Sequence, residues 1–183
     1  VDNVSFDVFG AAFYTEAGEE IGSFVNNLSI KTHGSGESPV SRGFEGEDLG
    51  HAGDGFWFQG GTGLTVRGNV ATGATGSGLI VFGVEALTES VDAIPFLAEN
   101  LPDPSLANGA ETVPAGLTWL GEFKDNTASG SVVGLQSYYH RSPISTDFEG
   151  QAEQLLEYQF DFPNSLIEDT TVWNAETGVL LNY

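Results

Sequence analysis

Cysteine and methionine are both absent from this chain of 183 residues, and basic residues are scarce. The lack of cysteine excludes a disulfide framework and any thiolate chemistry. Five lysines and arginines stand against 26 carboxylates, which gives a formal net charge of −21. Such a surface repels phosphate groups, so we expect neither nucleic acid nor anionic membrane surfaces as partners.

Long hydrophobic runs are missing as well. The longest uncharged stretch, Gly68–Val84, is interrupted by five glycines, whereas a membrane-spanning helix needs about 20 consecutive apolar residues. We therefore expect no membrane insertion. A chain of this length suffices for one sizeable core. Because it has no initiating methionine, we expect it to be a fragment of a longer protein.

What the sequence does contain is a fivefold repeat, in which an Asn or Thr precedes a Gly by seven or eight residues. The anchors are Asn3 and Gly10, Asn27 and Gly34, Asn69 and Gly76, Asn126 and Gly134, and Thr170 and Gly178. Each Gly leads, directly or after an insertion, into a dense apolar run, namely Phe13–Tyr14, Phe56–Phe58, Leu79–Phe82, Leu135 and Val179–Leu181. A constant unit with variable insertions is typical of solenoids.

The apolar runs are too short and too interrupted by glycine for helices, and they indicate strands separated by turns. We predict an all-β fold, a right-handed single-stranded parallel β-helix of the pectin-lyase-like type. About five coils should form one segment over residues 1–183, with loop insertions near 35–50, 84–118 and 138–164. The four Asn anchors should hydrogen-bond from coil to coil as a ladder, which makes them structural.

The two ends of the repeat show no capping element. Val1–Val4 begins inside a predicted strand, and Gly178–Tyr183 finishes on one. Bare ends of a solenoid expose strand edges and apolar interior. We therefore expect further coils of the same protein, or a copy of it, to stack on the ends.

Four segments resemble, in the same order, motifs of a known protein family. They are Gly10–Glu20, Gly55–Phe58, Leu120–Ala128 and Val172–Asn174. The segments are similar to the β-helix of the cell-migration-inducing and transmembrane hyaluronidases, which are related to fibrocystin-type proteins and carry a G8 domain ahead of the helix. The resemblance implies an extracellular, carbohydrate-associated β-helix and, in its enzymatic form, cleavage of hyaluronan. It assigns no catalytic residue to a position of this chain.

The richest polar stretch is Glu45–Gly55. Cleavage of a polysaccharide requires a proton acceptor and a proton donor beside the scissile bond, and His51 and Asp54 are the candidates for these roles. Trp57 and Tyr14 would offer flat apolar faces to sugar rings. The alternative is structural: the glycines turn the chain, Asp54 caps the turn, and the aromatic residues alternate between core and surface.

A second candidate for carbohydrate binding is the run Tyr138, Tyr139, His140 and Arg141. Two aromatic residues beside a His and an Arg suit a glycan subsite, in which Arg141 steers a carboxylate and His140 titrates near neutrality. The alternative is the foot of a loop, where Arg141 pairs with some of the abundant carboxylates.

Calcium is the one cofactor that the sequence leaves open. The acidic stretch 45–54 suits a hard cation, which takes clustered carboxylate oxygens. EF-hand spacing is absent, and Gly60–Val66 begins like a calcium-binding nonapeptide repeat but has Thr65 in place of the required Asp. The sequence therefore defines no set of metal ligands.

Two classes of function remain open. The first is a structural or adhesive scaffold that binds a polysaccharide or another cell-surface protein. The second is part of a polysaccharide-degrading enzyme, either a hyaluronidase-like hydrolase or a lyase. The strongly acidic surface is typical of proteins from marine or halophilic surroundings, and we expect an extracellular or cell-surface location.

Overall fold

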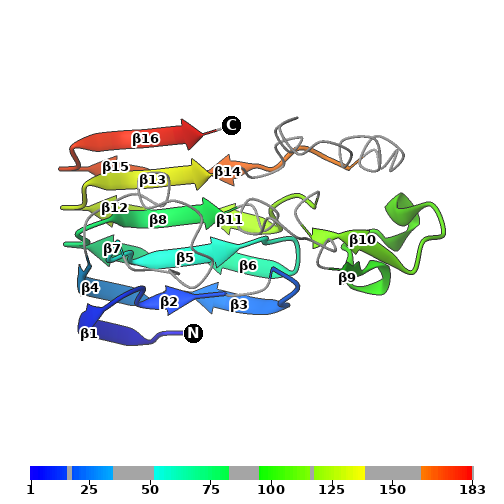
Figure 1. The fold of residues 1–183 in the computed structure, drawn as a ribbon, viewed down its shortest axis with the longest axis horizontal. Coiled ribbons are helices and arrows are strands. Elements are labelled where there is room, and N and C mark those ends of the chain that lie inside the picture. Colours follow the sequence, from blue (N-terminus) through cyan, green and yellow to red (C-terminus); the bar gives the residue numbers. More distant parts are fainter. Residues whose placement is uncertain (16–17, 35–51, 83–94, 116–117, 139–161, 183) are drawn as a thin grey trace, which may run out of the picture.

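A computed structural model describes residues 1–15, 18–34, 52–82, 95–115, 118–138 and 162–182. In these ranges the chain is all-β, with no α-helix, and its main body consists of three parallel sheets (Figure 1). In spatial order, sheet A holds β1 (Val4–Phe9), β4 (Leu28–His33), β7 (Val70–Thr72), β12 (Thr127–Ser129) and β15 (Thr171–Trp173). Sheet B holds β2 (Phe13–Tyr14), β5 (Phe56–Gln59), β8 (Ser77–Phe82), β13 (Val133–Tyr138) and β16 (Thr177–Asn182). Sheet C holds β3 (Gly22–Val25), β6 (Leu64–Arg67), β11 (Glu122–Lys124) and β14 (Ile167–Glu168).

The chain visits the three sheets in a fixed order. It runs through β1, β2 and β3, then through β4, β5 and β6, and later passages repeat the sequence A, B, C. Every pairing within the three sheets is parallel, and each strand pairs with its counterpart in the next passage. The prediction of an all-β chain with parallel strands is therefore confirmed.

One apolar core runs along the stack between the sheets. Its buried members are Phe56, Phe58, Leu64, Val66, Ala71, Leu79, Val81, Leu120, Phe123, Ala128 and Leu135. Aromatic rings join the sheets: Phe58 of sheet B meets Phe24 and Phe123 of sheet C edge to face, with ring centroids 5.2 and 6.2 Å apart. Each such side chain contributes about 1.5–3 kcal/mol when fully buried, so the dense runs after the Gly anchors supply much of the folding free energy.

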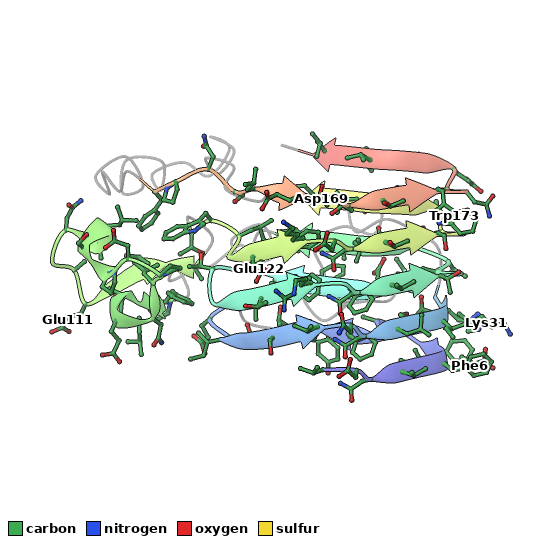
Figure 2. All side chains as sticks on the ribbon, turned by 180° about the vertical axis from the view of Figure 1, so that it is seen from behind. Phe6, Lys31, Glu111, Glu122, Asp169 and Trp173 are labelled. Atoms are coloured by element: carbon green, nitrogen blue, oxygen red, sulfur yellow. The ribbon has the colours of Figure 1, made fainter. Side chains whose placement is uncertain are left out.

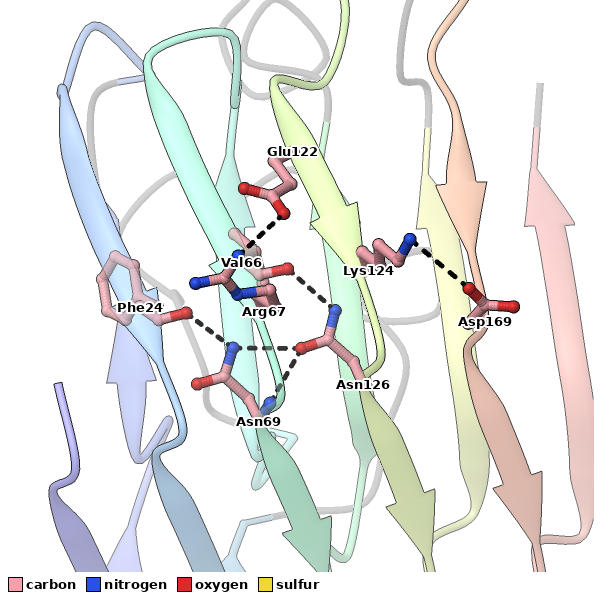
Figure 3. A network of polar contacts seen from close by, with 8 residues as sticks. All are labelled: Phe24, Val66, Arg67, Asn69, Glu122, Lys124, Asn126 and Asp169. Carbon is pink, nitrogen blue, oxygen red and sulfur yellow. Dashed lines mark hydrogen bonds and ion pairs between the residues drawn. The ribbon is translucent and has the colours of Figure 1, made fainter.

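The Asn ladder predicted from the sequence is confirmed. The backbone nitrogen and Nδ2 of Asn3 both donate to Oδ1 of Asn27 at 3.0 Å, and Asn27 donates in the same way to Asn69. The backbone nitrogen and Nδ2 of Asn69 donate to Oδ1 of Asn126 at 3.0 Å (Figure 3). Three of the four residues are buried, with 0–2% of their surface exposed. The ladder thus satisfies buried polar groups at one corner of the four units that carry Asn, and Thr170 stands at this position in the fifth.

The residue before each ladder position has a left-handed backbone. The five residues are Asp2, Asn26, Gly68, Asp125 and Asp169, with φ between 47° and 67°. Gly, Asn and Asp are the residue types that adopt this conformation at least cost. A second left-handed position comes four residues after each ladder position, as described below.

Glycine within sheet B allows sheets A and B to approach closely. Gly134 lies opposite Gly78, because Val133 pairs with Ser77 and Leu135 with Leu79. A β-carbon on Gly78 would lie 2.6 Å from the methyl group of Ala128 in sheet A. This register corrects the repeat proposed from the sequence, in which Gly76 was equated with Gly134. The turn between sheets A and B differs in length from one passage to the next.

An additional small core lies beside the stack. It contains the antiparallel strands β9 (Pro95–Leu97) and β10 (Thr112–Pro114) and the 3₁₀-helices η2 (Ala98–Asn100) and η3 (Pro104–Ala107). Its buried members include Phe96, Val113 and Trp119, together with Phe162 from further along the chain. The rings of Trp119 and Phe162 are 5.3 Å apart, so residues from both later insertions pack in one cluster.

Within the described ranges, no strand pairs beyond either end of the stack. Strands β1, β2 and β3 lie at one edge of the three sheets, and β15, β16 and β14 lie at the other (Figure 1). At the second edge the inward-pointing Val179 and Leu181 are 55% and 51% exposed. No helix in the part of the chain that the structure describes is long and apolar enough to cross a membrane.

Candidate functional site

Five residues form a straight row on the outer side of sheet A. Parallel pairing aligns Phe6 with Ile30, Ile30 with Thr72, Thr72 with Ser129, and Ser129 with Trp173. We call these five residues the outer row. Its two ends are aromatic and accessible, since Phe6 is 61% and Trp173 59% exposed. Figure 2 shows Phe6 and Trp173 at the same edge of the molecule.

Next to the outer row lies a second set of left-handed residues, of which two lie within β1 and β4 and three follow directly after β7, β12 and β15. We call them the turn row: Asp7, Lys31, Gly73, Gly130 and Asn174, with φ between 51° and 73°. The two central members are glycines, and β-carbons added there would come no closer than 3.7 Å and 3.5 Å to other atoms. The centre of the two rows therefore carries only short side chains, while its ends carry aromatic and polar ones.

The centre offers hydroxyl groups. The Ser129 hydroxyl donates to Oγ1 of Thr72 at 3.1 Å. This bond leaves the Thr72 hydroxyl proton free to donate, whereas the Ser129 hydroxyl is only 5% exposed. The backbone nitrogens of Gly73 and Gly130 donate to the carbonyls of Ser129 and Asn174, so the accessible side-chain polar group at the centre is the hydroxyl of the half-buried Thr72.

A charged cluster occupies one end of the rows. The Asp7 carboxylate lies 2.7 Å from Nε2 of His33 and 3.7 Å from Nζ of Lys31. The hydrogen bond with His33, followed by the charge of Lys31, lowers the pKa of Asp7 below its usual value. The Lys31 ammonium also lies 5.7 Å from the centre of the Phe6 ring, within the range of a cation–π contact. The single carboxylate of the cluster is thus already paired with both nearby cationic groups.

Two aromatic residues predicted to contact sugar are neighbours on the outer side of sheet B, where Tyr14 aligns with Trp57. Their surroundings differ. Tyr14 is 55% exposed and lines a hollow of about 510 Å³ with Ile21 and Phe24. Trp57 is 1% exposed, stacks on Phe82 at 4.9 Å and donates its indole N–H to Gln59. The Trp57 ring is packed inside the molecule, so we do not include it in the candidate site.

Of the two residues in the predicted acid–base pair, the structure describes only Asp54. Asp54 is 1% exposed and accepts a 2.6 Å hydrogen bond from the backbone nitrogen of Ser77. This contact ties Asp54 to the first residue of β8, which lies 23 residues further along the chain. His51 lies outside the described residues. The described residues therefore do not show an acid and a base side by side at this position.

The second predicted constellation lies almost wholly outside the described residues. Tyr139, His140 and Arg141 are not described, and for Tyr138 only the backbone position at the end of β13 is. The acidic stretch considered for calcium is likewise outside, apart from its last residues. Within the described ranges, no three or more His, Cys, Asp or Glu side chains gather in an arrangement able to hold a metal ion.

The sequence motifs discussed above did not point to the outer row. Phe6 and Trp173 stand three residues after the ladder positions 3 and 170, as do Ile30, Thr72 and Ser129 after theirs. Superimposing the repeats on the ladder and asking which positions point outward would have identified the row. The predicted sugar-binding aromatic residues Tyr14 and Trp57, which follow Gly anchors, lie in sheet B instead.

Comparison with known proteins adds no relative. No protein-family model, curated protein or solved structure matches the chain.

Proposed function

We propose that the three sheets form a right-handed, pectin-lyase-like parallel β-helix of about five coils. The fixed order of the sheets along the chain, the shared core and the continuous Asn ladder support this architecture. A β-helix presents its outer rows as straight lines of side chains at the spacing of adjacent strands, about 4.8 Å. Its surface therefore suits ligands that are themselves long and regular.

The function we propose is an extracellular or cell-surface scaffold that binds carbohydrate. The outer row carries the proposal: exposed aromatic rings at both ends flank a flatter centre, where Ile30 and Thr72 are half-buried and Ser129 is 5% exposed. Aromatic faces bury the apolar faces of sugar rings, and convergent polar groups orient the ligand. The net charge of −21 favours a soluble protein in a salty exterior.

The same site is better suited to binding than to cleavage. Glycoside hydrolysis uses two carboxyl groups about 5–10 Å apart, whereas Asp7 is the only carboxylate in the outer and turn rows. That carboxylate is held by His33 and Lys31. We therefore place the scaffold ahead of the polysaccharide-degrading enzyme.

The resemblance to hyaluronidases with a G8 domain supports the extracellular setting and stays part of the proposal. Its test is the gene: a signal peptide and a G8 region encoded upstream of Val1 would favour that family. Long arrays of other repeats on either side would favour an adhesin instead.

Binding and cleavage can be measured together. The protein is incubated with neutral and acidic glycans, binding is followed by calorimetry, and glycan length is followed by chromatography. We expect binding without shortening, loss of binding in the double variant Phe6→Ala/Trp173→Ala, and unchanged binding in the control Leu97→Ala, whose exposed side chain lies in the insertion. Shortened chains would reject the scaffold in favour of an enzyme, and the absence of any binding would reject the carbohydrate proposal.

A further inference from the structure

We propose that the outer row binds a linear neutral glycan that runs across the strands, with one sugar ring on each strand. This inference rests on the proposed function and adds the ligand's direction, length and charge. Five strands contribute to the outer row, so Phe6 and Trp173 are separated by four strand spacings, roughly 19 Å. One pyranose of an extended chain advances by nearly the same distance as one strand spacing.

The sizes of the side chains fit this direction. A glycan lying along the outer row meets an aromatic ring at each end, the half-buried Ile30 next to Phe6, and short side chains at the centre, where Thr72, Ser129, Gly73 and Gly130 lie. A glycan lying parallel to one strand would meet at most one of the exposed rings. Only the path across the strands uses both Phe6 and Trp173.

The charge of the ligand follows from the cluster at the Phe6 end. Lys31 and His33, the described cationic groups near the outer row, both face the Asp7 carboxylate. No ammonium is left to compensate the carboxylates of an acidic glycan, and the chain's charge of −21 repels them. This negative charge does not weaken the binding of a neutral glycan. Asp7 therefore acts as a specificity-determining residue.

The turn row supplies a variant that blocks the centre without disturbing the fold. Asn adopts the required left-handed backbone at Asn174 in the same row (φ 51°), and a β-carbon on Gly130 meets only ordinary contacts at 3.5 Å and 4.0 Å. Gly130→Asn should therefore fold and place an amide over the centre of the row. Gly109→Asn is the matched control, because Gly109 also has positive φ (85°), has open space around it, and lies in the insertion.

The fluorescence of Trp173 can report binding at the outer row. Trp173 is 59% exposed, while Trp57 and Trp119 are 1% and 8% exposed. A sugar ring stacked on the outer row should change the fluorescence of Trp173 and leave the other two indoles unaffected. The full chain is titrated with cello-oligosaccharides of two to six units and with oligogalacturonates of the same lengths.

We expect the affinity for cello-oligosaccharides to rise with each unit up to five and then to level off, and oligogalacturonates to bind at least tenfold more weakly. Gly130→Asn and Trp173→Ala should each weaken cello-pentaose binding about tenfold or more, equivalent to about 1.4 kcal/mol, with Gly109→Asn unchanged. Asp7→Asn should narrow the gap between neutral and acidic glycans.

The outcomes separate the inference from the proposed function. Affinity that stops rising at two units, or tighter binding of oligogalacturonates, overturns the inference while a binding face remains. Binding that survives Gly130→Asn also overturns it. If the double variant Phe6→Ala/Trp173→Ala still binds glycan, the glycan does not bind at the outer row, and both the inference and the proposed function are overturned.

Discussion

The central residue of the Asn ladder should be the most sensitive polar position in the fold. Asn69 is fully buried. Its Oδ1 accepts from the backbone nitrogen and Nδ2 of Asn27 at 3.0 and 2.9 Å, and its Nδ2 donates to Oδ1 of Asn126 and to the Phe24 carbonyl. Asn69→Ala removes all four bonds. Three groups then lose the hydrogen bond that Asn69 made to them: the backbone nitrogen and Nδ2 of Asn27, and the carbonyl of Phe24.

The magnitude follows from this count. A buried polar group that loses its partner costs about 1–3 kcal/mol, so three such groups predict a loss of roughly 4 kcal/mol. Domains of this kind are stable by about 5–15 kcal/mol, and the variant should be close to unfolding. Asn3→Ala is the matched control, because Asn3 is exposed and keeps its backbone bond to Asn27. It should cost about 1 kcal/mol or less.

Equilibrium unfolding in urea measures both variants, provided that the m-values agree. Asn69→Asp adds a test by pH. It retains the acceptor for Asn27 but turns an oxygen toward Oδ1 of Asn126, which raises the pKa of the new carboxyl, so its destabilisation should grow as the pH rises above about 4. Losses for Asn69→Ala and Asn3→Ala that agree within about 1 kcal/mol would refute the idea of a buried ladder.

Three further predictions concern other positions of the repeat. Thr170→Asn should extend the ladder by one rung and raise the free energy of unfolding by about 1 kcal/mol; a lower value would contradict this. Gly78→Ala should destabilise by about 1–3 kcal/mol, since its β-carbon would lie 2.6 Å from a facing methyl group, whereas Gly178→Ala, with nothing within 4 Å, should be nearly neutral; equal losses would argue against close approach of the sheets. The hydrogen bond with His33, followed by the charge of Lys31, lowers the pKa of Asp7 from 3.8, so the stabilisation by the Asp7 carboxylate is present above that value and is lost as the pH falls through the lowered pKa. An NMR titration should show the pKa of Asp7 rising when His33 is replaced by Asn, and an unchanged pKa would reject the pairing.

Much of the architecture could be predicted from the sequence, because the fold demands particular residue types at fixed points. The ladder needs an amide, which is why Asn27, Asn69 and Asn126 are recognisable. The register of sheet B was harder to predict, since Gly76 and Gly78 are both plausible anchors and only the backbone pairing shows that Gly78 is the equivalent of Gly134.

The candidate site was harder still, because side-chain direction depends on that register. Trp57 alternates away from the core residues Phe56 and Phe58, which is typical of an exposed platform, yet it is 1% exposed. Phe6 and Trp173 are far apart in sequence and share no motif. They fall in one row only when the repeats are aligned on the ladder positions, three residues before each member of the row.

The outer row differs from the open edges in one physical respect. Val179 and Leu181 point inward, so their exposure depends on whether other strands cover the edge formed by β16. Phe6 and Trp173 point outward, but they lie on the two edge strands of sheet A, and the inner members of the row are less exposed: Ile30 and Thr72 are half-buried and Ser129 is 5% exposed. Additional strands paired to β1 or β15 would lengthen the outer row and reduce the exposure of the two rings. The proposed binding face therefore depends on both rings standing at the ends of the row.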